Sequence, residues 1–258
     1  MAIVNGNPAI SYYDATNGYL KYVRASNASG TSWGSPVTVD NTATTGQYTR
    51  LVVINGNPAI AYYDVTNGDL KYVRATDASG TTWGSPVTVT STDDIGQYLS
   101  LAVINGNPAI SYYDVTGGDL EYVRASDASG TTWGTPVTVE SANTVGQYTS
   151  LTTVSGNPAI SYYDVTNGNL RYVRASDASG TTWGTPIEVA STDDRKVHLI
   201  GYSQWQARNI LRRNTCKPCR IIQVEICTGF RRNRHYMGYV KYIRPCRWWI
   251  YFSYINKC

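Results

Sequence analysis

Cysteine is absent from the first 194 residues of this 258-residue chain, and all five cysteines lie between Cys216 and Cys258. This absence excludes a disulfide scaffold for the first part of the chain. Nowhere do about 18 apolar residues follow one another, so no membrane-spanning helix is expected. The start, Met1-Ala2-Ile3-Val4, has no leader with a basic and an apolar region. We therefore expect no secretory signal peptide in this chain.

Lysine and arginine are scarce in the same part. Residues 1–194 contain eight Lys and Arg against 17 Asp and Glu, a net charge of −9. Residues 195–258 contain 14 Lys and Arg against one Glu, a net charge of +13. The overall charge of +4 therefore averages two unlike parts. We call residues 1–194 the repeat region and residues 195–258 the tail.

One stretch of sequence, Gly-Asn-Pro-Ala-Ile-Ser-Tyr-Tyr-Asp, organises the repeat region. It recurs every 50 residues, with one Ser→Ala change at Ala61, as Gly6–Asp14, Gly56–Asp64, Gly106–Asp114 and Gly156–Asp164. This period predicts four units, at about residues 1–50, 51–100, 101–150 and 151–194. Met1 falls at the phase of Leu51 without the Gly-Gln-Tyr that precedes later units, as expected of a truncated start.

Each unit is expected to form four short strands. In the third unit, runs of apolar and β-branched residues alternate with turn sequences, which predicts strands at 99–104, 109–114, 120–125 and 137–140. The hairpin-length turns between them indicate an antiparallel meander. One such sheet cannot bury both of its faces, so we predict an all-β fold, a β-propeller of stacked four-stranded antiparallel blades. The alternative is an array of separate sheets, each with little core.

A polar loop with one tryptophan precedes the fourth predicted strand of each unit. The four tryptophan loops are Ser26–Trp33, Thr76–Trp83, Ser126–Trp133 and Ser176–Trp183. They resemble the Asp-box of sialidase-type (BNR) propellers, Ser-x-Asp-x-Gly-x-x-Trp, although Ala occupies the Asp position in all four. The resemblance implies structural loops on the rim opposite an active site. On that resemblance, the residues with a packing role are Gly30, Trp33, Gly80, Trp83, Gly130, Trp133, Gly180 and Trp183.

The tail has no repeat in its own reading frame. Shifted by one nucleotide, Ser203–Asn214 can be back-translated as V-N-G-K-P-A-I-S-Y-D-V-T, and Val224–Tyr239 as a later part of the repeat. Two steps do not depend on codon choice, because Trp205 before Gln must give Gly and Met237 before Gly must give Trp. We therefore predict that the tail is a fifth blade translated out of frame. Codons incompatible with the shifted peptide in the coding DNA would exclude this.

Two alternatives for the tail are a zinc module and a nucleic-acid-binding module. Cys216 and Cys219 have the spacing of half a zinc site, but Cys227, Cys246 and Cys258 supply no second close pair. The positive charge suits nucleic acid, but a blade read out of frame acquires charge without any function. We expect no metal, no cofactor and no nucleic-acid partner.

Ligands of a propeller usually meet the rim that carries the links between blades and the turns between the second and third strands. Tyrosine rings supply contact area there, and amides and carboxylates orient sugar hydroxyls. The candidate ligand-binding residues are Tyr13, Asp14, Gln47, Tyr48, Tyr63, Asp64, Gln97, Tyr98, Tyr113, Asp114, Gln147, Tyr148, Tyr163 and Asp164. The structural alternative is that each Asp holds its own turn and the Tyr pairs fill contacts between blades.

The near-identity of the units favours binding over catalysis. A lectin-like or adhesion-type module would carry several equivalent weak sites, and linked sites raise the overall affinity. A sialidase-like glycoside hydrolase needs different residues from different blades, whereas here the third-strand arginine recurs in every unit. Glu121 replaces the cation of the other units, which predicts a solvated position. We expect no catalytic residue; a structural fragment of a larger surface protein is the third possibility.

The expected partners are glycans or another protein. If the ring needs more than four blades, two exposed edge strands invite self-association. Composition and the resemblance favour an extracellular or cell-surface location.

Overall fold

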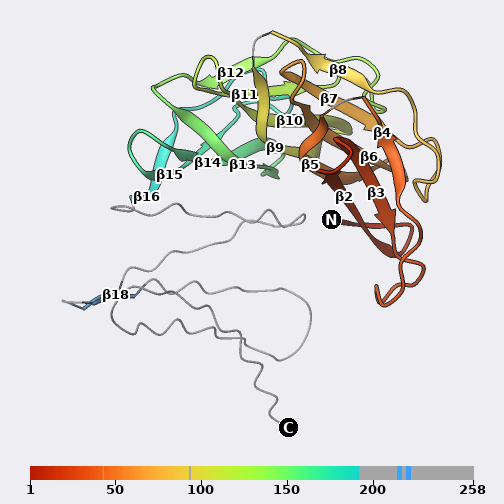
Figure 1. Ribbon diagram of the computed structural model, residues 1–258. Helices are drawn as coiled ribbons and strands as arrows, with labels where there is room; N and C mark the ends of the chain where they lie inside the picture. The colour runs from red at the N-terminus through yellow and green to blue at the C-terminus, as the bar shows by residue number, and fades with distance from the viewer. Residues whose placement is uncertain (43, 93, 192–213, 217–218, 222–258) are drawn as a thin grey trace. The chain divides into compact units, whose positions relative to one another are not determined.

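Four antiparallel sheets form the repeat region of the computed structural model, which describes residues 1–42, 44–92, 94–191, 214–216 and 219–221 (Figure 1). The first sheet contains β1 (Ala2–Val4), β2 (Asn7–Asp14), β3 (Tyr19–Arg24) and β4 (Val37–Asp40). The second contains β5 (Thr45–Ile54), β6 (Asn57–Asp64), β7 (Asp69–Arg74) and β8 (Val87–Thr90). The third contains β9 (Ile95–Ile104), β10 (Asn107–Asp114), β11 (Asp119–Arg124) and β12 (Val137–Glu140). The fourth contains β13 (Val145–Val154), β14 (Asn157–Asp164), β15 (Asn169–Arg174) and β16 (Ile187–Ser191). The predicted all-β fold of four-stranded antiparallel units is confirmed.

Within each sheet the strands follow one another in chain order, as predicted for a meander. The first turn is a two-residue hairpin in which Asn5 and Gly6 have φ of 43° and 80° and Val4 pairs with Asn7. Two consecutive positive φ values match the right-handed twist of the flanking strands, and Asn-Gly is the sequence that adopts them most readily. The turn chemistry therefore fixes the register of the first two strands in each sheet.

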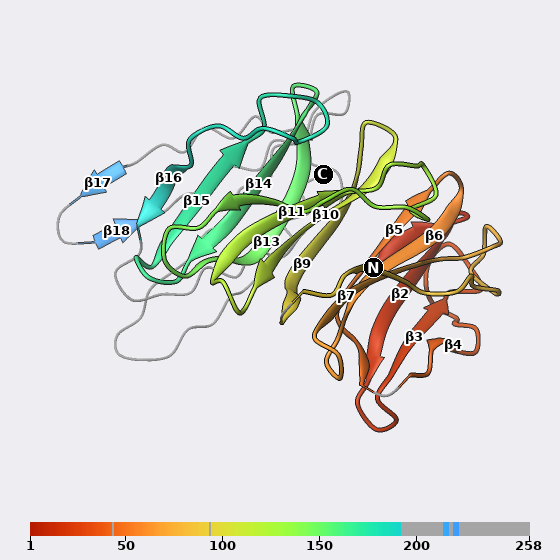
Figure 2. The same ribbon diagram turned by 90° about the horizontal axis from the view of Figure 1, so that it is seen from above.

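Neighbouring sheets pack face to face, as the two views show (Figure 1, Figure 2). Between the first two sheets, Leu20 and Tyr22 of β3 share one buried cluster with Ile60 and Tyr62 of β6. Each of these side chains is at most 1% exposed, and burial of each stabilises the fold by about 2 kcal/mol. Because every cluster combines two sheets, the alternative of separate sheets is wrong. We call the face toward the next sheet downstream and the face toward the preceding sheet upstream.

The chain divides into two compact units, Met1–Trp205 and Gln206–Cys258. In the second, β17 (Asn214–Cys216) pairs antiparallel with β18 (Cys219–Ile221). Apart from these strands, the predicted out-of-frame blade at residues 195–258 lies outside the described residues. Within the part of the chain that the structure describes, no helix has the length and hydrophobicity to cross a membrane.

Candidate functional site

The links between sheets and the turns after β2, β6 and β10 lie together. Thr45 N donates to Gly18 O at 3.0 Å, and Ile95 N donates to Gly68 O at 3.0 Å. The third link makes the equivalent contact, in which Val145 N donates to Gly118 O at 2.9 Å. Each link is thus hydrogen-bonded to the turn of the preceding sheet. This brings the predicted ligand-binding residues of neighbouring sheets to one rim.

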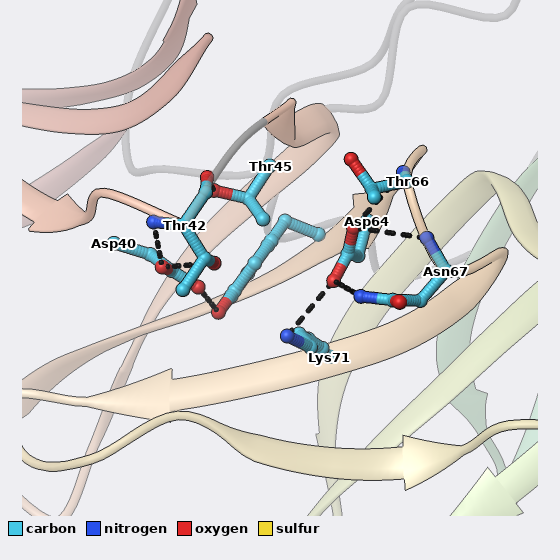
Figure 3. A network of polar contacts seen from close by, with 8 residues as sticks. Asp40, Thr42, Thr45, Asp64, Thr66, Asn67 and Lys71 are labelled. Atoms are coloured by element: carbon cyan, nitrogen blue, oxygen red, sulfur yellow. Dashed lines mark hydrogen bonds and ion pairs between the residues drawn. The ribbon is translucent and has the colours of Figure 1, made fainter.

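Asp64 is held by its own turn and by a lysine (Figure 3). Its carboxylate accepts hydrogen bonds from Thr66 N at 3.1 Å and from Asn67 Nδ2 at 2.9 Å, and Lys71 Nζ lies 2.8 Å away. Asp64 is 0% exposed. Burial by itself would raise the pKa of this carboxyl, but the hydrogen bonds from Lys71 and Asn67 lower the pKa below its ordinary value.

The other three aspartates at this position also accept hydrogen bonds from their own turns. Asp14 accepts from Thr16 N at 3.2 Å, Asp114 from Thr116 N at 2.8 Å, and Asp164 from Asn167 Nδ2 at 2.8 Å. Their carboxylates close the turn as Asx side chains do. Each of the four aspartates is therefore engaged by its own turn, as the structural alternative predicted.

The glutamines and tyrosines of the links lie in a bulge of the strand that opens each sheet. Gln97 pairs with Tyr113, and the next regular pair is Ser100 with Ser111, so Tyr98 and Leu99 face a single residue of β10. Tyr98 has a φ of 50°, and Tyr48 and Tyr148 have φ of 52° and 54°. A bulky residue rarely adopts this left-handed conformation, which is strained and clusters at functional positions.

The bulges align three tyrosine rings, Tyr48, Tyr98 and Tyr148, which we call the tyrosine row. The ring centroids of Tyr48 and Tyr98 are 4.9 Å apart, and those of Tyr98 and Tyr148 are 4.5 Å apart. All three rings are half-buried. A second tyrosine from the neighbouring strand lies 6.1 to 6.4 Å from each ring; these are Tyr63, Tyr113 and Tyr163. The sequence-predicted tyrosines of the second, third and fourth sheets therefore meet. Tyr13 of the first sheet is half-buried.

The phenols of Tyr98 and Tyr63 ionise less readily than a free tyrosine. Burial, with the neighbouring rings of Tyr48 and Tyr148, raises the pKa of Tyr98. Burial and the acceptor Asp94 raise the pKa of Tyr63 to about 12. Tyr48 OH donates to Gln97 Oε1 at 3.4 Å. The row presents aromatic rings and hydroxyls beside amides, a set suited to neutral hydrogen-bonding ligands.

Two tyrosine–carboxylate pairs across sheet junctions were not predicted from the sequence. Tyr62 OH donates to Asp40 Oδ2 at 2.6 Å, and Tyr162 OH donates to Glu140, which also pairs with Arg171. Asp40 further accepts from Thr42 N at 2.9 Å (Figure 3). Both tyrosines are 0% exposed. Burial, with the adjacent carboxylates, raises the pKa of both phenols, the opposite of what a nucleophile requires.

The recurring third-strand arginines lie at the other end of the sheets and bind backbone carbonyls. Arg24 Nε donates to Val4 O at 2.8 Å, and Arg124 Nε donates to Ile104 O at 2.9 Å. The remaining two repeat the contact; Arg74 donates to Ile54 O and Arg174 to Val154 O. Each guanidinium caps the hairpin between the first two strands of its own sheet.

The tryptophan loops share this end. In the third loop, Asp127 accepts from Thr132 N at 2.7 Å and Ser129 N at 2.8 Å, and Trp133 Nε1 donates to Gly130 O at 3.0 Å. Burial opposes ionisation, but the donors Thr131 and Thr132 lower the pKa of Asp127 strongly. The carboxylate that holds this turn therefore belongs to Asp127. It lies one residue before Ala128, which occupies the Asp position of the Asp-box pattern. Among the described residues, a cavity of about 380 Å³ also lies here, lined by Tyr72 and Gly130 among others.

Glu121 corrects one expectation. It was predicted to be solvated, but only 8% of it is exposed, and its side chain accepts from Thr138 Oγ1 at 2.6 Å. Burial, with the charges of Asp114 and Asp119, raises the pKa of Glu121. In the second sheet Lys71 occupies this position and pairs with Asp64. In the second sheet this partly buried position holds the cation of an ion pair. In the third sheet it holds the carboxyl group of Glu121, near a second acidic residue, Asp114.

Comparison with known proteins identifies the fold. No protein-family model matches the chain, and no curated protein matches it in sequence. Among solved structures it resembles a variant of the exo-β-1,3-galactanase of Phanerochaete chrysosporium with β-1,3-galactotriose: the TM-score is 0.50 at 10% identity, over 72% of this chain and 50% of that chain. It also resembles the GH62 α-L-arabinofuranosidase catalytic domain of Coprinopsis cinerea, with a TM-score of 0.48 at 12% identity over 72% and 64% of the two chains. The Hadza microbial sialidase Hz136 has a TM-score of 0.48 at 16% identity, over 70% and 44%.

These identities indicate a shared fold alone. The four sheets form a propeller-like arrangement, as predicted. The chain spans half the length of the galactanase chain.

Proposed function

We propose that the repeat region is a non-catalytic, lectin-like binding module whose ligand is a neutral glycan bound along the tyrosine row. The observation that carries this proposal is the repeated left-handed φ of Tyr48, Tyr98 and Tyr148. These three bulky residues adopt a strained backbone conformation, and their half-buried rings lie in one row. The strain lowers the stability of the fold relative to strands with ordinary φ values. A ligand that stacks on those rings gives that strain a role.

The chemistry of the row supports a sugar. The apolar faces of pyranose rings stack on aromatic side chains, and sugar hydroxyls pair with amides and phenols. Gln47, Gln97 and Gln147 are half-buried beside the three rings, so the second, third and fourth sheets each offer the same pair of groups. Equivalent sites favour multivalent binding, in which weak single contacts add to a useful affinity.

The charge of the repeat region favours a neutral glycan over an acidic one. Its net charge is −9, and the carboxylate of Asp94 accepts the hydroxyl of Tyr63 at this rim. A sialic acid or uronic acid would bring a further negative charge to that surface, which is unfavourable.

Several contacts support binding without catalysis. The recurring arginines are engaged by backbone carbonyls, as Arg24 is by Val4 O at 2.8 Å. The pair of Tyr162 and Glu140 has the residue types of a glycosidase nucleophile and its base, but the tyrosine is 0% exposed and its pKa is raised. Burial of that kind prevents contact with a substrate.

The tryptophan loops support a relationship with sialidase-type propellers. We infer that they are a degenerate Asp-box in which the carboxylate has moved one residue toward the N-terminus, to Asp77, Asp127 and Asp177. Backbone N–H groups of the loop donate to this carboxylate; Thr82 N donates to Asp77 at 2.7 Å. Sugar binding on the opposite rim would then be retained from such an ancestor, and catalysis would be lost.

A glycan array followed by calorimetry tests the proposal. The full chain should bind neutral oligosaccharides, and Tyr98→Ala should weaken binding about tenfold, because it removes the central stacking surface. Tyr98→Phe keeps the ring and should keep most of the affinity. Tyr19→Asp is the matched control, because it replaces another tyrosine of this rim with the residue of the next two sheets. Release of sugar from a glycoside, or binding that Tyr98→Ala leaves intact, would contradict the proposal.

A further inference from the structure

The three junctions between neighbouring sheets repeat one set of contacts. On the downstream face of each of the first three sheets, a tyrosine hydroxyl donates to a serine carbonyl in the tryptophan loop of the next sheet. The pairs are Tyr22 with Ser79 at 3.0 Å, Tyr72 with Ser129 at 3.1 Å, and Tyr122 with Ser179 at 3.0 Å. The same tyrosine rings pack edge-on against Trp83, Trp133 and Trp183, with centroids 5.1 to 5.3 Å apart.

The upstream face of the first sheet carries one half of this junction in an exposed state. Trp33 is 41% exposed, whereas its counterparts in the other three sheets are partly buried. Ile10 and Tyr12 are half-buried, although Ile60 and Tyr62 in the second sheet are 0% exposed. The first sheet therefore has the apolar surface of a junction without the burial.

The downstream face of the fourth sheet carries the other half. Leu170 and Tyr172 are half-buried, whereas Leu120 and Tyr122 at the same positions of the third sheet are 0% and 1% exposed. The tyrosine at the position that donates across every junction inside the chain is thus only half-buried here. The two faces are complementary, because three copies of the same interface lie between them in the chain.

We propose that a second copy of this chain covers these faces, head to tail. The downstream face of the fourth sheet in one copy packs on the upstream face of the first sheet in the next. Tyr172 of one copy donates its hydroxyl to Ser29 O of the second copy and packs edge-on against Trp33 there. The contact repeats the geometry of Tyr122 with Ser179 and Trp183.

The space for that tyrosine is present in the first tryptophan loop. A Cβ atom at Gly30 would meet Pro8 Cγ at 3.4 Å and a Trp33 ring atom at 4.0 Å, whereas a Cβ at Gly180 would lie 2.6 Å from the ring of Tyr122. A tyrosine from another copy therefore fits against Gly30 as Tyr122 fits against Gly180.

A second copy is the occupant that the faces specify, because each copy brings both halves of an interface whose fit is established inside the chain. Such an interface is heterologous: the surface used on one copy differs from the surface used on the other. It either closes a ring of copies or extends into a chain of them. Both outcomes depend on the same two faces.

Light scattering coupled to size exclusion, on the full chain over a range of concentrations, measures the association. The chain has a mass of 28.4 kDa, and we expect at least twice that mass at high concentration. Trp33→Glu and Tyr172→Glu should each give a species of 28.4 kDa, because each disrupts one of the two faces that every contact between copies requires. Tyr172→Phe removes only the hydroxyl and should weaken association about fivefold.

Mixing the two charged variants distinguishes head-to-tail packing from every symmetric mode. The Trp33→Glu copy keeps an intact fourth-sheet face, and the Tyr172→Glu copy keeps an intact first-sheet face. The mixture should therefore form one junction and stop at the mass of two copies. Pairing through sheet edges or through two like faces predicts no such rescue.

Val103→Glu is the matched control, because Val103 is also 41% exposed but lies on β9 away from both faces. It should associate as the unmodified chain does. Circular dichroism should show folded protein for all variants, and Tyr172→Phe covers the case in which Tyr172→Glu does not fold. A chain that stays at 28.4 kDa at every concentration, or association that neither Trp33→Glu nor Tyr172→Phe weakens, overturns the proposal.

Discussion

Gly130 lies against the ring of Tyr72 from the neighbouring sheet, so that a Cβ atom at position 130 would be 2.5 Å from Tyr72 Cε1. Gly130 also has a φ of +75°. We expect Gly130→Ala to lower the free energy of unfolding by about 3 kcal/mol, from the clash and the left-handed backbone together. Urea denaturation of the variant and the unmodified chain measures this.

Gly106→Ala isolates the backbone contribution. Gly106 has a similar φ of +80°, but nothing lies within 4 Å of its Cβ position. Its substitution should lower the free energy of unfolding by about 1 kcal/mol. Equal effects of the two substitutions would show that the contact between Gly130 and Tyr72 contributes nothing to the junction.

Asp127 organises the third tryptophan loop, and its removal should loosen that loop. Asp127→Ala deletes the acceptor of Ser129 N at 2.8 Å and Thr132 N at 2.7 Å. We expect a loss of about 1 to 2 kcal/mol, as for the loss of a helix-capping side chain. Asp127→Asn should lose less, because Asn27 already serves Thr31 N at 3.1 Å in the first loop. Thermal unfolding of the two variants checks the order; a larger loss for Asn than for Ala would refute this role.

The repeat and its turn residues were sufficient to predict the sheets. Asn-Gly and Thr-Asn-Gly turns separate the strands. Their positive φ values, as at Gly6 with a φ of 80°, favour tight hairpins over other connections between neighbouring strands. The stacking of sheets followed from the need to bury both faces of each one. These features are local or periodic, so a single sequence carries them.

The remaining features depend on contacts between distant residues. No property of Tyr98 indicates a left-handed φ of 50°, because the bulge that imposes it arises from pairing with β10. The pair of Tyr62 and Asp40 joins two sheets across 22 positions. The prediction that Glu121 is solvated was wrong. It was based on the charge of the equivalent residue Lys71, but Lys71 is half-buried because it pairs with Asp64. Charge alone did not reveal the burial.

We expect the replacement of Glu121 by lysine to stabilise the third sheet. Glu121→Lys would place a cation beside Asp114, as Lys71 Nζ stands 2.8 Å from Asp64 Oδ2. We expect the free energy of unfolding to rise by about 1 kcal/mol at neutral pH. The reverse change, Lys71→Glu, should lower it, and chemical denaturation measures both. A stabilising Lys71→Glu would contradict the ion-pair interpretation.

The pH dependence of Glu121→Gln gives an independent check. Burial, with the charges of Asp114 and Asp119, raises the pKa of Glu121 in the folded chain. The folded state therefore takes up a proton more readily than the unfolded state, and ionised Glu121 costs stability above its folded pKa. That cost disappears as the pH falls through the raised pKa. The advantage of Glu121→Gln should thus be largest near about pH 7 and shrink toward about pH 4; an advantage that grows on acidification would sink this account.

The strain at Tyr98 reverses the usual order of glycine and alanine. In a strand with ordinary φ, glycine is less stable than alanine by about 1 kcal/mol, because it loses more backbone freedom on folding. At a φ of 50°, alanine carries the left-handed cost and glycine does not, so Tyr98→Gly should be more stable than Tyr98→Ala by about 1 kcal/mol. Tyr122, which is not among the positive-φ residues, is the control, and there Tyr122→Ala should be the more stable of the pair. Both comparisons cancel the loss of the aromatic ring, since each pair of variants lacks it equally. Denaturant unfolding of the four variants measures the two differences; the same sign at both positions would remove the strain on which the proposed binding row depends.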